Sequence, residues 1–285
     1  MVPWRRERMF LHRNQVRRSI TICNAPPYSA CSVLVRLYAA MGLHSYNLLH
    51  GENLELSRVL RYSKTAGPPA ASSYCITLDV MEPSLGLVRT FETSVSEQSY
   101  GELSLRYNFA RPHGETKKSY NVGDEIMRSS DASDEYFRLC CNCMPEMPRL
   151  NPFQNKKRFY LLKKSEVEEN AWIRMYLDLA FATTNRGTSK EPDLSKLEIV
   201  EVAVSIEESN TSTSDTDEGL GLGLGFSRAT NAVFYIRHMD WCKARVKKND
   251  VDRVAIVRRI FIHRTGCFSL VGKIHSSQTL PKPKK

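Results

Sequence analysis

Residues 54–81 read LELSRVLRYSKTAGPPAASSYCITLDVM, and this stretch predicts a β-hairpin. Three leucines in its first part fall on one face, and residues 74–81 alternate as a half-buried strand does. This tip carries no acid, base or metal ligand, so we expect a rigid apolar contact surface for a protein partner rather than a site of chemistry. The tip residues of this candidate interaction surface are Ala66, Gly67, Pro68 and Pro69.

Residues 33–48 precede the hairpin and predict an α-helix, because their apolar side chains recur at spacings of three and four residues. Gly51 follows as the residue that ends the helix. After the hairpin, residues 87–95 and 103–109 read as two more strands, and the short turns between them make neighbouring strands antiparallel. Residues 32–111 therefore predict one unit of the α+β class, a helix packed on an antiparallel β-meander.

The order of helix and strands recurs in residues 158–275. Ser165 and Glu168 form a capping-box pattern that begins a helix running to Thr184. After this helix, LEIVEV at 197–202 echoes the LELSRV that opens the first hairpin. We expect a second unit of the same kind, with coincidence as the alternative to an internal repeat.

The strands of the second unit have clear patterns. Their first apolar run changes phase between Ile199 and Val200, which indicates a β-bulge. Residues 232–239 predict the next strand. Residues 253–263 and 267–274 predict a hairpin, because a three-residue loop that ends in glycine separates them.

Two stretches lack such patterns. Residues 112–157 are rich in proline and glycine, and we expect a linker or irregular insertion. Residues 207–229 are acidic, then glycine-alternating, and we expect a disordered loop. No strand and helix flank these glycines, so they do not predict a phosphate-binding loop or any cofactor. A lone cysteine cluster, without a second ligand pair, predicts reduced thiols rather than zinc; its members are Cys140, Cys141 and Cys143.

The formal net charge of +10 is concentrated at the two ends of the chain. Residues 1–31 form a basic leader with six arginines and Glu7 as its lone acid, which predicts either a mitochondrial transit peptide or a disordered arm. Residues 276–285 form a basic tail. No apolar run reaches the roughly 18 residues that a bilayer span needs; the best candidate, Ala30 to Leu43, is shorter and contains Arg36. We expect a soluble protein of the nucleus or cytoplasm, with no membrane partner, or of the mitochondrion if the leader is a transit peptide.

A further basic run, KARVKK at 243–248, is a second candidate interaction surface. Its charges could follow a nucleic-acid backbone, although a solvated sheet face gives the same pattern. The side chains concerned are Lys243, Arg245, Lys247 and Lys248.

Only one short stretch resembles catalytic chemistry. His238, Asp240 and Cys242 lie within five residues, but they share a face only while a strand continues. We interpret them as polar residues at a strand end. The sequence therefore predicts no catalytic residues, no metal and no cofactor.

The first unit resembles a plant cystatin. LYAA at 37–40, followed by the strands at 54–59, 74–80 and 90–95, has the helix-and-meander order of that family. The resemblance implies a cystatin-like fold for each unit. The family's inhibitory wedge uses a glycine before the helix, a Gln-x-Val-x-Gly hairpin and a Pro-Trp hairpin, and none of these occurs here.

A second set of motifs is similar to a plant-specific family of unassigned biochemistry, which includes a "male sterility five" type and embryo-defective paralogues. The resemblance implies a role in male fertility, meiosis or embryo development. The motifs are GLHSYN at 42–47, NFARP at 108–112, ATTNR at 182–186, LSKL at 194–197, AIVRR at 255–259, RTG at 264–266 and SLVG at 269–272.

These observations predict an α+β protein made of two cystatin-like units, each a helix on an antiparallel β-meander. We expect a non-enzymatic protein that binds other proteins and regulates plant reproductive development. Two alternatives stay open: a cystatin-type protease inhibitor with a degenerate wedge, and a nucleic-acid-binding protein that uses the basic C-terminal region.

Overall fold

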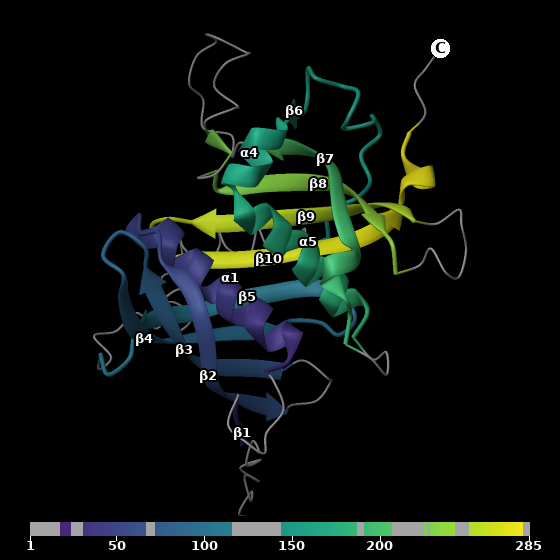
Figure 1. The fold of residues 1–285 in the computed structure, drawn as a ribbon. Helices are drawn as coiled ribbons and strands as arrows, with labels where there is room; N and C mark the ends of the chain where they lie inside the picture. Colours follow the sequence, from purple (N-terminus) through teal and green to yellow (C-terminus); the bar gives the residue numbers. More distant parts are fainter. Residues whose placement is uncertain are drawn as a thin grey trace, which may run out of the picture.

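The computed structural model describes residues 18–23, 31–66, 72–115, 144–186, 191–206, 225–226, 229–242 and 251–281. Within these ranges, ten strands form one antiparallel sheet in the order β1-β2-β3-β4-β5-β10-β9-β8-β7-β6 (Figure 1). The strands are β1 Arg18–Ile22, β2 Glu55–Ala66, β3 Ser72–Glu82, β4 Leu87–Glu97, β5 Leu103–Pro112, β6 Tyr160–Leu161, β7 Leu197–Ile206, β8 Asn231–Asp240, β9 Asp252–Ile262 and β10 Cys267–Ser276. The helices are α1 Val33–His50, α4 Lys164–Glu169 and α5 Ala171–Thr184, with short 3-10 turns at Leu194–Lys196 and Ser277–Thr279.

The predicted α+β class is confirmed. In the first half four strands follow α1, and in the second half four long strands follow α4 and α5. The finer expectation of two separate units, each with its own sheet, is not confirmed. Four residues of β5, Leu103–Arg106, pair with Ser269–Gly272 of β10, so the halves form one continuous sheet. One apolar core cluster also contains residues of both halves. The likeness of each half to a cystatin stays a prediction.

Helix α1 lies on the sheet as its apolar spacing predicts. Tyr38 and Met41 are completely buried, and the left-handed Gly51 (φ 69°) donates its N–H to Asn47 O at 2.8 Å to end the helix. Gly42 permits the close approach to β4. A Cβ on Gly42 would lie 2.0 Å from Oγ1 of Thr93, so only glycine fits there.

The predicted single helix from Ser165 is wrong, because the chain forms two helices that meet at Asn170. This residue has the non-helical angles φ −113° and ψ 65°. Its side-chain Nδ2 donates a hydrogen bond to Glu166 O at 2.7 Å, and its Oδ1 accepts one from Trp172 Nε1 at 3.0 Å. The carboxylate that caps the first turn of α4 belongs to Glu166 rather than to the predicted Glu168. It accepts a hydrogen bond from Lys163 N at 2.7 Å. Asparagine's competition with backbone hydrogen bonds accounts for the break.

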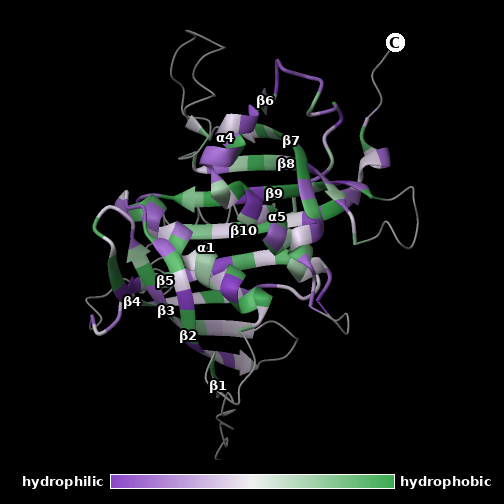
Figure 2. Ribbon diagram, viewed as in Figure 1, coloured by the Kyte–Doolittle hydropathy of each residue, from purple (hydrophilic) through white to green (hydrophobic). Residues whose placement is uncertain are grey.

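Helices α1 and α5 cross the same face of the sheet (Figure 1). On the opposite face, residues Met147 and Phe153 and the C-terminal Leu280 pack against β7, β8 and β9. Strands β8 and β9 are therefore buried on both faces, and hydrophobic residues recur along them (Figure 2). In residues 144–157, part of the predicted irregular insertion, the chain is indeed turns without a helix or strand.

The predicted bulge is confirmed. Ile199 pairs with His238, and Glu201 pairs with the adjacent Arg237, so Val200 is the extra residue. Its side chain is half exposed. The hairpin of β9 and β10 around residues 264–266 is confirmed as well.

The expectation that all of residues 1–31 are disordered is wrong for its last part. Arg18–Ile22 forms β1, which pairs antiparallel with β2, and Cys23 is buried beside it. Ile20, Thr21 and Ile22 are β-branched, and such residues favour a strand. Residues 1–17 and 24–30 lie outside the described ranges, as do residues 116–143, which contain the three clustered cysteines. Among the helices described, none is long and apolar enough to cross a membrane.

Candidate functional site

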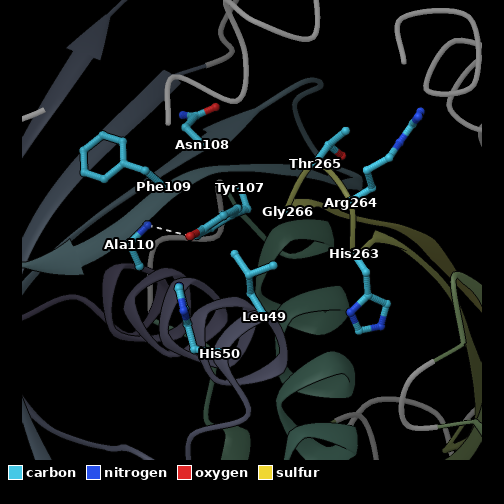
Figure 3. A pocket seen from close by; sticks show the side chains of 10 residues that line it. All are labelled: Leu49, His50, Tyr107, Asn108, Phe109, Ala110, His263, Arg264, Thr265 and Gly266. Carbon is cyan, nitrogen blue, oxygen red and sulfur yellow. Dashed lines mark hydrogen bonds between the residues drawn. The ribbon is translucent and has the colours of Figure 1, made fainter. Parts of the chain in front are cut away.

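A cavity of about 340 Å³ opens where the two halves of the sheet separate (Figure 3). Strand β5 pairs with β10 only as far as Arg106, and beyond it the two strands diverge. The C-terminal end of α1 closes the space between them. The lining residues are Leu49, His50, Tyr107, Asn108, Phe109, Ala110, His263, Arg264, Thr265 and Gly266.

Apolar residues such as Leu49, Phe109 and Ala110 line this cavity together with polar ones, and two of the polar residues already make hydrogen bonds within the fold. The hydroxyl of Tyr107 accepts a hydrogen bond from Ala110 N at 2.6 Å, and burial raises the pKa of Tyr107 to about 12. Asn108 donates to Ser94 and Ser96 Oγ, at 3.1 and 2.8 Å. In Figure 3, Arg264 extends away from the space beside Leu49. The cavity therefore offers a small binding volume rather than a converged set of reactive groups.

The stretch His238 to Cys242 is not assembled for catalysis. Strand β8 ends at Asp240, and Cys242 lies beyond it with its thiol directed to Asp193 O at 3.6 Å. His238 Nδ1 lies 3.2 Å from Ile236 O, and burial lowers the pKa of His238. We expected polar residues at a strand end, and His238 and Asp240 do end β8, yet both are completely buried. Arg253 lies 3.7 Å from Asp240 and is its charge partner.

A second buried polar group joins the two helices, and the sequence reasoning missed it. His44 of α1 lies 3.1 Å from the hydroxyl of Tyr176 of α5 and stacks on Trp172, with ring centroids 5.4 Å apart. Arg259 is completely buried beneath them, 5.3 Å from the Trp172 ring. Burial, with a smaller effect of the Arg259 charge, lowers the pKa of His44 to about 3. A neutral imidazole therefore belongs to the folded state.

A buried ion pair links the end of α5 to the first half of the sheet. Arg186 Nη1 lies 2.5 Å from Glu97 Oε1, and Arg186 Nη2 donates to the Tyr74 hydroxyl at 2.8 Å. Tyr38 and the backbone N–H of Ser72 also donate to Glu97, at 2.7 and 3.1 Å. Burial and the Glu97 charge raise the pKa of Tyr38. This group fixes how the two halves meet and is enclosed by protein.

Among the exposed apolar side chains of the described residues, two groups are close in sequence. On the edge strand β1, Ile20 is 74% exposed and Ile22 is 51% exposed. At the turn between β3 and β4, Leu85, Leu87 and Val88 are each more than half exposed. Scattered apolar residues are normal on protein surfaces, but groups of them indicate binding surfaces.

The predicted interaction residues fall mostly outside the described ranges. Ala66 is the last residue of β2, while Gly67, Pro68 and Pro69 are not described. The same applies to the basic run Lys243, Arg245, Lys247 and Lys248. The two exposed groups on β1 and at the β3–β4 turn were not predicted. Alternation of isoleucines at 20 and 22 was the available signal, but the arginines around them concealed it. In the part of the chain that is described, no group of three or more His, Cys, Asp or Glu could hold a metal ion.

Comparisons with known proteins agree on one family. The family described as Protein MS5 matches residues 144–270. UPF0725 protein At3g19520 of Arabidopsis thaliana is 32% identical over 254 residues, covering 88% of this chain and 77% of that protein. UPF0725 protein EMB2204 of the same plant is 35% identical over 253 residues, covering 88% of this chain and 69% of that protein.

A solved structure supports the same assignment. The crystal structure of MS5 from Brassica napus is similar with a TM-score of 0.61 and 26% identity, covering 86% of this chain and 99% of that chain. The names of these relatives fit a role in plant reproduction or development, as the sequence motifs implied. The chain belongs to the plant MS5/UPF0725 family.

Proposed function

We propose that this protein is a non-enzymatic regulator of plant reproductive development, in male fertility and meiosis or in the embryo, and that it acts by binding another protein. The relatives named MS5 and EMB2204 support the developmental part of this proposal. The nucleus or cytoplasm is the proposed location, with the mitochondrion as the alternative.

The observation that carries the binding proposal is the edge of the sheet at β1, where no further strand pairs with β1 among the described residues. A ten-stranded sheet has two edges, and here β6 at one edge is only two residues long. At the other edge, β1 is five residues long and exposes Ile20 and Ile22. Exposed edge strands pair readily with other chains unless they are blocked. The group at Leu85, Leu87 and Val88 offers a further apolar contact area.

Two other functions remain to be tested against this one. A cystatin-type inhibitor would slow papain-like proteolysis at micromolar concentration. A nucleic-acid-binding protein would show binding that weakens steeply with added salt. The ion pair of Glu97 and Arg186 lies within the fold and gives neither alternative particular support.

The test is recovery of the full-length tagged chain from developing flowers after mild chemical cross-linking. We expect one or a few proteins in near-stoichiometric amount, identified by mass spectrometry. A parallel sample with Leu87→Asp and Val88→Asp reports on the β3–β4 turn. If the chain is recovered alone, or with nucleic acid as its only companion, the proposal is wrong.

A further inference from the structure

We propose that the outer edge of β1 binds an extended, acidic segment of a partner protein as an added strand of the sheet. This inference rests on the proposed function and specifies where the partner binds and what chemistry it has.

The hydrogen-bonding phase of β1 shows which backbone groups are on the outer edge. Cys23, directly after β1, donates its N–H to Leu60 O at 2.9 Å. In an antiparallel ladder, hydrogen-bonded pairs alternate with pairs that are not hydrogen-bonded. The pair of Thr21 and Tyr62 is therefore of the bonded kind. The N–H and C=O groups of Ile20 and Ile22 point the other way, to the outer edge.

The side chains of the same two residues make this edge attractive to another strand. Ile20 and Ile22 lie two residues apart, so both project from the same face of the sheet. Each is more than half exposed. Side chains that lie directly opposite each other on an antiparallel pair interact, so a strand with apolar or β-branched residues opposite Ile20 and Ile22 would be stabilised. Within the described residues, β1 contains no proline and pairs regularly with β2, so neither a proline nor a bulge protects this edge strand there.

Charge decides which partner fits this edge. Strands β1 and β2 together carry four basic residues and one acid, Glu55. On β2, Arg58 has a side chain that is 65% exposed although it pairs with Asp79, and Arg61 is exposed as well. An acidic strand would be attracted to these charges both on approach and when bound.

The same charges argue against the two other occupants. A second copy joined through β1 would bring two sets of basic side chains together, and like charges across strands destabilise the pair. A nucleic acid would satisfy the arginines but would leave Ile20 and Ile22 without an apolar partner. A peptide segment uses the backbone groups, the isoleucines and the charges together.

The experiment uses the full-length chain and a fluorescein-labelled nine-residue peptide of alternating valine and glutamate. Binding is measured by fluorescence anisotropy. Ile20→Pro removes an N–H that points outward and bonds nothing in β2, so we expect peptide affinity to fall about tenfold or more. The double variant Ile20→Thr, Ile22→Thr keeps the backbone and lowers affinity severalfold, since it removes only apolar contact. If Ile20→Pro disturbs the pairing of β1 with β2, this double variant still tests whether the peptide binds at β1.

Two controls make the result specific. Val200→Thr changes another half-exposed β-branched residue, on β7, and should leave peptide affinity unchanged. A peptide with lysine in place of glutamate should bind at least about tenfold more weakly than the acidic one. Sedimentation of the chain alone should give a monomer.

Three results would overturn the inference. They are equal peptide binding by wild type and both β1 variants, a dimer that Ile20→Pro dissociates, and a single-stranded oligonucleotide that binds β1 more tightly than the peptide does. Failure here is distinguishable from failure of the proposed function. A chain that recovers protein partners from flowers but ignores the acidic peptide binds them elsewhere.

Discussion

Replacing Arg186 by methionine removes one partner of the buried ion pair that joins the two halves of the molecule. Methionine keeps most of the side-chain volume but leaves the carboxylate of Glu97 without its counter-charge. The side chain of Glu97 is only 2% exposed, and that of Arg186 is 17% exposed. The carboxylate thus cannot recover its lost interaction from water.

The magnitude follows from these contacts. Breaking a buried ion pair by removing one partner costs about 3–5 kcal/mol. We expect the lower end of this range for Arg186→Met, about 3 kcal/mol, because Tyr38 and Ser72 still donate hydrogen bonds to Glu97. Adding Glu97→Gln to Arg186→Met removes the stranded charge, so the double variant should lose less than the sum of the single variants. The coupling should exceed about 1 kcal/mol.

The assay is urea unfolding of the four proteins of this cycle, followed by tryptophan fluorescence and circular dichroism at one pH. Coincident curves from the two probes would justify a two-state treatment. Lys164→Met is the matched control, since Lys164 makes only an exposed ion pair with Glu168 and should change stability by less than about 0.5 kcal/mol. If Arg186→Met were no more destabilising than Lys164→Met, the ion pair would not hold the halves together.

Three further predictions concern the close approach of α1, the buried histidine and the β3–β4 turn. Gly42→Ala should lower the free energy of unfolding by about 1–3 kcal/mol, because its Cβ would overlap Thr93, and Thr93→Ala in the same chain should restore part of the loss in urea unfolding. The pKa of His44 is about 3 in the folded state against 6.5 ordinarily, so unfolding takes up a proton between these values. Stability should therefore fall as pH drops below about 6.5, by up to roughly 1.4 kcal/mol per pH unit until about pH 3, and His44→Gln should flatten this dependence; an unchanged slope would contradict the assignment. Leu87→Ser with Val88→Ser should change stability by less than about 0.5 kcal/mol, since both side chains are more than half exposed, while reducing cross-linking to partners in floral extracts.

Local patterns in the sequence predicted most of the individual elements. Strands such as β3 alternate with a period of two, and the stop at Gly51 needs a left-handed residue, so both are visible without tertiary information. The bulge at Val200 was visible as a change of phase. The break at Asn170 was not, because it depends on its side chain donating a hydrogen bond to Glu166 O and accepting one from Trp172 Nε1.

The way in which the elements assemble could not be predicted in the same manner. The pairing of β5 with β10 joins segments more than 160 residues apart, and no local pattern records it. For the same reason, Glu97 and Arg186 read as ordinary surface charges until the fold brings them together. The outer edge of β1 became a candidate site only when the strand order placed it at the end of the sheet. Which strand lies at an edge is a property of the whole sheet.

Hydrogen exchange of the native, full-length chain at the seam between β5 and β10 tests most directly whether the two halves form one sheet. The N–H groups that pair Leu103–Arg106 with Ser269–Gly272 should exchange as slowly as those of strands β8 and β9, which are buried on both faces. They should do so at a rate set by unfolding of the whole molecule. Seam protons that exchange far faster, while β3 and β8 stay protected, would mean that the halves open independently and that the continuous sheet is wrong.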